Sequence, residues 1–168
     1  ILDSILVMGA ACKVKGRAEK LVNGLKERVD ASQKFSAGLS RPRVLVSFTG
    51  GIKNAFIAGK NTFYDELIEL AGGTNAYQDE KIKFPYVSRE GIISLNPDII
   101  LNMIPLSQGK GLKAADVLNE WMGLTELRAV REGRVYVLGN DYVTIPGPRF
   151  VVLLEDMKRL IHPDGNGQ

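Results

Sequence analysis

The chain has 168 residues, of which 45% are hydrophobic and 24% charged, a composition typical of a globular domain rather than of a disordered segment. Its net charge is +3, but no basic run interleaved with aromatic side chains occurs, so we expect no nucleic-acid partner. The single cysteine, Cys12, and single histidine, His162, exclude an internal disulfide and a Cys/His zinc site. No apolar run approaches the ~20 residues that a membrane-spanning helix needs.

Helical periodicity dominates the start of the chain. Apolar residues recur at helical spacing from Leu2 to Gly9 and again from Ala18 to Val29. Because the pattern only weakens between these stretches, it predicts one long helix over residues 1–35, with a bend near Gly16. A linker is predicted to follow over residues 36–42, where proline ends any helix.

The rest of the chain alternates between strand and helix patterns. Strands are predicted at 43–49, 98–102 and 134–138, with a short extended piece at 74–77. Helices are predicted at 62–71, 88–95, 113–122, 125–130 and 148–161, with Thr62 and Ser88 as N-caps. This alternation predicts a Rossmann-like α/β lobe of three layers with a mostly parallel sheet, preceded by the long helix.

The loop after the first predicted strand, residues 50–61, contains several glycines. A phosphate-binding loop would need glycine where Asn54 stands and serine or threonine where Asn61 stands, so this loop does not match one. Its small residues would let the backbone lie close to a bulky ligand, which Phe56 or Lys60 could reach. A plain strand-to-helix turn is the other interpretation.

The loop after the last predicted strand is the second candidate site, because an open α/β sheet binds its ligand at the carboxyl ends of its strands. Asp141 and Tyr142 lie in this loop. Tyr142 either contacts a ligand or packs against the rest of the lobe.

The remaining residues of chemical interest have structural interpretations. Trp121, at helical spacing from other apolar residues, is predicted to lie in the core. The helical acid pairs 65–66 and 155–156 are predicted to face solvent, and His162 to end the last helix. We therefore expect no catalytic set and no enzyme activity.

Four segments together resemble hallmark stretches of the bacterial periplasmic binding proteins for vitamin B12 and iron–siderophore complexes, which feed ABC importers. They are Phe63–Asn75, Ser88–Ile100, Leu127–Leu138 and Pro146–Arg149. The resemblance implies two α/β lobes joined by a long helix, with the ligand between them. It assigns residues 1–37 to the linking helix and 38–168 to the C-terminal lobe, with the other lobe missing. It also implies a periplasmic or other extracytoplasmic location, and is compatible with a lipid anchor in the parent protein.

Carried over by position, the resemblance implies ligand contacts from the loop containing Gly50, Gly51, Phe56 and Lys60, from the loop after Asn102, and from Asp141 and Tyr142. In the B12 binder of this family an aromatic residue after aspartate packs on the corrin, and Tyr142 matches it. A glutamate just beyond that aromatic docks on transporter arginines. Thr144 stands there instead, which leaves docking to another acid such as Glu155.

The resemblance thus predicts a protein that captures a corrinoid and delivers it to a membrane permease, peripheral to the membrane and without a resident cofactor. A ferric siderophore held by Lys53, Lys60 and Arg149 is the alternative ligand, and haem or a molybdate-like oxyanion are others. A nucleotide-binding enzyme domain and a lobe that only docks on a partner are the alternatives of a different class. We expect this chain to fold alone and to bind weakly, since half a cleft leaves much of a large ligand exposed.

Overall fold

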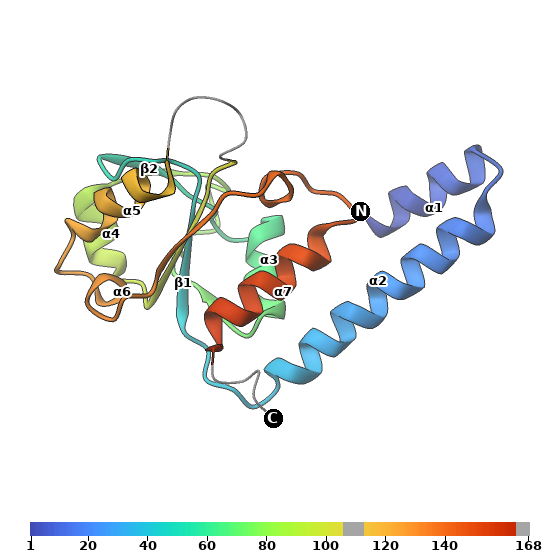
Figure 1. Ribbon diagram of the computed structural model, residues 1–168, viewed down its shortest axis with the longest axis horizontal. Helices are drawn as coiled ribbons and strands as arrows, with labels where there is room; N and C mark the ends of the chain where they lie inside the picture. The colour runs from blue at the N-terminus through green and yellow to red at the C-terminus, as the bar shows by residue number, and fades with distance from the viewer. Residues whose placement is uncertain (106–112, 164–168) are drawn as a thin grey trace.

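A computed structural model of the chain describes residues 1–105 and 113–163 as an α/β lobe from which a helical hairpin projects (Figure 1). The strands are β1 (Arg43–Ser47), β2 (Asn54–Phe56), β3 (Thr74–Asn75), β4 (Tyr86–Ser88), β5 (Ile99–Met103) and β6 (Val135–Leu138). The helices are α1 (Leu2–Ala11), α2 (Lys15–Ser36), α3 (Phe63–Leu70), α4 (Arg89–Leu95), α5 (Ala114–Met122), α6 (Arg128–Arg131) and α7 (Phe150–Ile161), with a 3₁₀ turn, η2 (Asp141–Val143).

The central sheet has the strand order β3-β1-β5-β6, and every pairing in it is parallel. Successive residues of its strands point to opposite faces, as the two-residue period of a strand requires. Val44 and Val46 enter a core shared with α2, α3 and α7, whereas Leu45 enters a second core shared with α4, α5 and α6. Trp121, fully buried, belongs to this second core. The predicted three-layer α/β fold with a mostly parallel sheet is confirmed.

The helical start of the chain differs from the prediction. Instead of one long helix, α1 and α2 form an antiparallel hairpin (Figure 1). The reversal occurs at Lys13, whose φ of 57° is left-handed and cannot continue a helix. The helices touch at Gly9, where an added Cβ would lie 2.2 Å from the Cβ of Ala18. The expectation of a single helix bent near Gly16 is therefore wrong.

Two short strands are also absent from the prediction. β2 and β4 lie in segments predicted as loops and pair antiparallel, with Phe56 opposite Tyr86. Strands of three residues show little periodic pattern of their own. The N-caps, in contrast, are confirmed, since the Thr62 and Ser88 side chains accept hydrogen bonds from backbone N–H groups in the first turns of α3 and α4.

Helix boundaries near the end of the chain shift slightly. α6 begins at Arg128 rather than Thr125, and α7 begins two residues after Pro148. His162 follows α7 as predicted, and one of its ring nitrogens lies 3.1 Å from the Gly72 carbonyl oxygen. Much of the predicted ligand loop after Asn102, residues 106–112, lies outside the described residues, as do residues 164–168.

Candidate functional site

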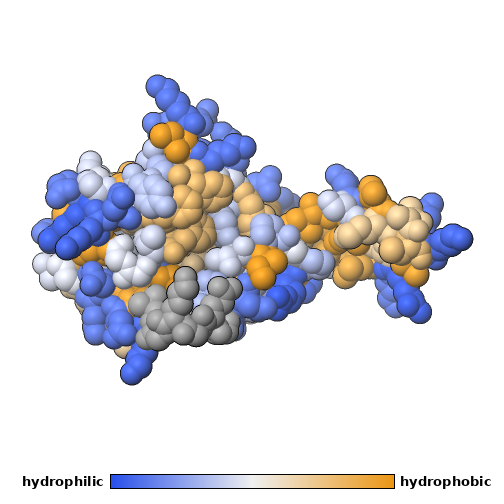
Figure 2. All heavy atoms as spheres, turned by 90° about the horizontal axis from the view of Figure 1, so that it is seen from above, coloured by the Kyte–Doolittle hydropathy of each residue, from blue (hydrophilic) through white to orange (hydrophobic). Residues whose placement is uncertain are grey.

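Four aromatic side chains form a continuous surface beyond the carboxyl end of β1, and we call Phe48, Phe56, Phe84 and Tyr86 the aromatic surface. The Phe56 ring centre lies 5.8 Å from that of Phe48, 5.8 Å from that of Phe84 and 4.9 Å from that of Tyr86. Phe84 is 40% exposed and Tyr86 is 66% exposed. Seen from the side on which the parallel strands end, the lobe carries a hydrophobic area in its middle (Figure 2).

Backbone pairing holds these rings together. The Phe48 N–H donates to the Phe56 carbonyl at 2.9 Å, which joins the end of β1 to β2. The register of β2 with β4 places Phe56 opposite Tyr86, and residues directly opposite in a strand pair have neighbouring side chains. The Thr49 hydroxyl closes the intervening turn, since it accepts from the Phe56 N–H and donates to the Gly51 carbonyl. The turn at Gly50 and Gly51 thus positions the aromatic surface.

The loop after β6 brings together three of the predicted ligand residues. The Arg149 guanidinium binds both carboxylate oxygens of Asp141, at 2.9 and 2.7 Å, and these hydrogen bonds lower the pKa of Asp141. The Tyr142 hydroxyl donates to Asp156 at 2.5 Å and accepts from the Asn140 amide at 2.9 Å. Burial and then the Asp156 carboxylate raise the pKa of Tyr142. Arg149 also lies over the Tyr142 ring, 5.7 Å from its centre.

Tyr64 connects this loop to the aromatic surface. Its hydroxyl donates to the Val143 carbonyl at 3.0 Å, and its ring centre lies 4.8 Å from that of Phe48. Burial raises the pKa of Tyr64 to about 12, so the hydroxyl keeps its proton to a higher pH than an exposed tyrosine does. The loop after β6 and the aromatic surface therefore lie beside each other.

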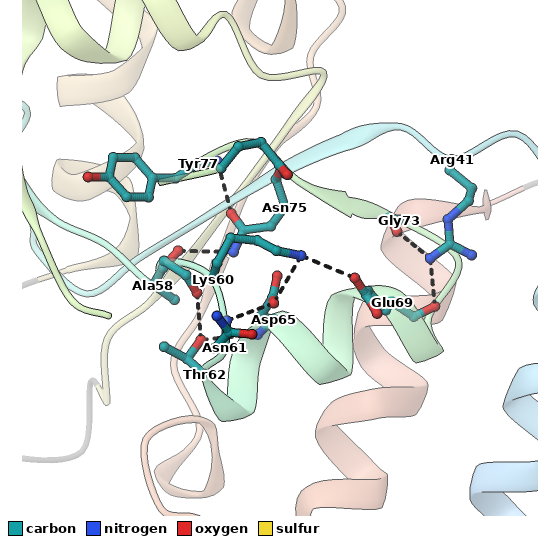
Figure 3. Close-up of polar contacts among 12 residues, drawn as sticks. Arg41, Ala58, Lys60, Asn61, Thr62, Asp65, Glu69, Gly73, Asn75 and Tyr77 are labelled. Carbon is teal, nitrogen blue, oxygen red and sulfur yellow. Dashed lines mark hydrogen bonds and ion pairs between the residues drawn. The ribbon is translucent and has the colours of Figure 1, made fainter. Parts of the chain in front are cut away.

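Lys60, in the loop before α3, belongs to a separate polar group with two acids of that helix, which we call the Lys60 cluster: Lys60, Asp65 and Glu69 (Figure 3). The Lys60 ammonium lies 3.2 Å from Asp65 and 3.3 Å from Glu69. Burial alone would lower the pKa of Lys60, but the hydrogen bonds to these two carboxylates outweigh it and raise the pKa. Asp65 also accepts from the Asn61 N–H at 2.9 Å. Asp65 is buried, so the prediction that it faces solvent is wrong, whereas Glu66 is exposed.

The predicted site residues thus fall into three groups in the structure. Gly50, Gly51 and Phe56 belong to the aromatic surface and its turn; Asp141, Tyr142 and Arg149 share the loop after β6; Lys60 lies in its own cluster. The sequence prediction missed three members of the aromatic surface, Phe48, Phe84 and Tyr86. Alternation of Ile82, Phe84 and Tyr86 at a spacing of two is the signal that could have found two of them.

Two further properties of the described ranges 1–105 and 113–163 bear on function. Within them, no three or more histidine, cysteine, aspartate or glutamate side chains gather in a way that could hold a metal ion. In the same ranges, no helix is both long enough and apolar enough to cross a bilayer.

Comparison with known proteins gives consistent matches across nearly the whole chain. Residues 1–142 match the family described as periplasmic binding protein. The uncharacterized ABC transporter substrate-binding lipoprotein YvrC of Bacillus subtilis is 28% identical over 166 residues, which cover 98% of this chain and 50% of that protein. The vitamin B12-binding protein of Salmonella typhi is 22% identical over 157 residues, covering 94% of this chain and 54% of its own length.

Among solved structures, the periplasmic heme-binding protein RhuT from Roseiflexus sp. RS-1 superposes with a TM-score of 0.79 at 27% identity. The superposition covers 98% of this chain and 62% of that one. The chain spans about half the length of these two curated relatives, YvrC and the Salmonella typhi protein.

Proposed function

The chain belongs to the periplasmic binding protein family, as its sequence motifs predict, and we propose that it is one lobe of the substrate-binding component of an ABC importer. In this proposal the lobe works outside the cytoplasm, and it passes the ligand to a membrane permease. Its role is binding rather than catalysis. The single observation that carries the proposal is the exposed aromatic surface, which lies where an open α/β sheet binds its ligand.

We propose that the ligand is a corrinoid. A corrinoid is a large, flat and amphipathic disc, which aromatic side chains contact well. Of the three cations that would favour an anionic siderophore, Lys60 and Arg149 are already paired with carboxylates of the same lobe. Lys53 is exposed and takes part in no ion pair among the described residues. The name of the Salmonella typhi relative supports the same choice.

Haem is the second candidate, because one specific residue favours it. Tyr86 presents a 66% exposed phenol on the aromatic surface, and a tyrosine oxygen is an established axial ligand of haem iron. The similarity to the Roseiflexus heme-binding protein agrees with this alternative. The two candidates differ in what they need from Tyr86, namely an oxygen for haem and only a ring for a corrinoid.

The surface of the hairpin supports a cleft formed with a second lobe. Val7 is 68% exposed and Met8 is 59% exposed on α1, a helix whose only charged residue is Asp3. A helix that is apolar on all sides is normally covered. Hydrophobic atoms of the hairpin lie on the same face of the molecule as the hydrophobic area of the lobe (Figure 2). One second lobe resting on α1 would cover this helix and close over the aromatic surface.

The test is a set of parallel titrations of the 168-residue chain with cyanocobalamin, haemin and a ferric tris-catecholate siderophore. We expect saturable, weak, one-to-one binding of cyanocobalamin, followed by its visible absorbance. The Tyr86→Phe variant should keep this binding, because the ring remains. Haemin binding that Tyr86→Phe abolishes would replace the corrinoid with haem, and tight binding of ATP or NAD by the chain would contradict the binding-protein role altogether.

A further inference from the structure

The positive charge of the chain is concentrated in one short segment. Residues 12–21 contain four basic side chains, Lys13, Lys15, Arg17 and Lys20, against one acidic side chain, Glu19. This segment therefore carries as much net positive charge as the whole chain, and the remaining residues are balanced. Such a concentration indicates a surface that meets an anionic partner.

The segment occupies the tip of the α1–α2 hairpin, the part of the molecule that projects farthest from the sheet (Figure 1). Residues 10–17 are all exposed. Lys15 pairs with Glu19 at 3.7 Å, whereas Lys13, Arg17 and Lys20 take part in no ion pair within the described ranges. Most of the charge at the tip is thus available to a partner.

Apolar side chains are exposed between these cations. Val14, between Lys13 and Lys15, is 40% exposed, and Leu21, beside Lys20, is 44% exposed. Leu21 also lines a shallow hollow of about 490 Å³ on α2, where Gly24 has no side chain to fill the space. Cations alternating with exposed aliphatic side chains are typical of protein surfaces that lie in the headgroup layer of an anionic membrane.

We propose that the hairpin tip binds the surface of a bilayer that contains anionic phospholipids. The lysine and arginine side chains contact headgroup phosphates, and Val14 and Leu21 enter the boundary between headgroups and acyl chains. The partner is a lipid surface rather than a nucleic acid, because the tip has aliphatic side chains and no aromatic residue on which a base could stack. With so few cations the contact is reversible and weakened by salt.

The experiment is co-sedimentation of the chain with vesicles of phosphatidylcholine alone or mixed with phosphatidylglycerol. We expect binding only to the mixed vesicles, and about a twenty-five-fold weaker partition for the double variant Lys13→Gln, Lys15→Gln, since each lysine near such a surface contributes about fivefold. The matched control is Lys81→Gln, Lys83→Gln, which removes the same charge at the same spacing from the lobe and should change binding little. Circular dichroism verifies that both double variants remain folded.

Val14→Ser tests whether the Val14 side chain enters the boundary between headgroups and acyl chains. It should weaken partition of the chain onto the mixed vesicles about fivefold without a change in charge. Equal binding to neutral vesicles, or equal losses in the two double variants, would overturn the proposal. So would binding of soluble polyglutamate as strong as that of the mixed vesicles and insensitive to Val14→Ser, because the tip would then bind any polyanion.

Discussion

The aromatic surface and the Lys60 cluster lie on the same lobe but differ in whether their side chains already have partners. Phe84 and Tyr86 remain 40% and 66% exposed even though each contacts a neighbouring ring. The side chains of Lys60 and Asp65 are only 17% and 7% exposed, and each binds the other. A charged residue near a strand end is thus a weaker sign of a ligand site than an exposed aromatic ring, because its charge can be neutralised within the lobe.

This contrast predicts that the Lys60 cluster stabilises the fold whereas the aromatic surface binds the ligand. Asp65→Ala should lower the free energy of unfolding by about 3 kcal/mol, since it leaves a largely buried ammonium with one partner fewer and removes the acceptor of the Asn61 N–H. Urea denaturation at neutral pH measures the change. The matched control is Glu66→Ala, which removes the exposed acid next to it and should change stability by less than about 0.5 kcal/mol. Equal losses in both variants would show that burial at Asp65 has no special role.

Removal of the exposed rings should have the opposite outcome. The double variant Phe84→Ser, Tyr86→Ser is expected to weaken corrinoid binding tenfold or more, an effect of about 1.4 kcal/mol, with little loss of stability. Absorbance titration gives the affinity and urea denaturation the stability. Met122→Ser, which replaces a 43% exposed apolar side chain on α5, is the control and should leave affinity unchanged. An affinity equal to that of the unmodified chain would remove the aromatic surface from the site.

Arg149→Gln should sharpen the comparison between ligands. Because its guanidinium already binds Asp141 at both oxygens, we expect corrinoid affinity to change by no more than about threefold. If Arg149 instead releases Asp141 and binds a ferric siderophore, Arg149→Gln should greatly weaken siderophore binding. A large loss of siderophore affinity would therefore favour a siderophore as the ligand. Parallel titrations of both ligands distinguish these results.

The smallest expected effect concerns the ion pair that joins α7 to the hairpin. Hydrogen bonds from Arg28 to Glu155 lower the pKa of this carboxyl from its ordinary value of 4.5. The folded state then gains stability that is present above pH 4.5 and lost as the pH falls through the lowered folded pKa. Both side chains are nearly half exposed, so the gain is under about 1 kcal/mol. Arg28→Gln should have a slightly lower free energy of unfolding than the unmodified chain at neutral pH, and this difference should vanish in acid. A difference that persists at low pH would show that Arg28 stabilises the fold through packing rather than through its ion pair.

Local patterns were sufficient to predict much of the fold. The buried strands β1, β5 and β6 follow from their apolar runs, and α3 and α4 start where Thr62 and Ser88 cap them. The hairpin could not be predicted in the same way. Its reversal depends on a left-handed lysine and on close packing of Gly9 against Ala18, and neither leaves a local signal.

The candidate site was only partly predictable for a similar reason. Phe56 was identified from its loop, but its neighbours Phe84 and Tyr86 come from a segment about thirty residues later, and only the register of β2 with β4 brings them together. Lys60 was predicted from its loop and its charge, and Arg149 from its charge. Their acidic partners became apparent only when α3 and the loop after β6 were in place.

The most direct test of the ligand role of the aromatic surface is a ¹H–¹⁵N NMR titration of the chain with cyanocobalamin, which detects weak binding and locates it. We predict that the largest shift changes will lie in residues 48–59 and 82–88, with smaller changes in the loop after β6 and none at the far ends of α2 and α6. Shift changes centred away from the aromatic surface, or none at saturating ligand, would contradict the account.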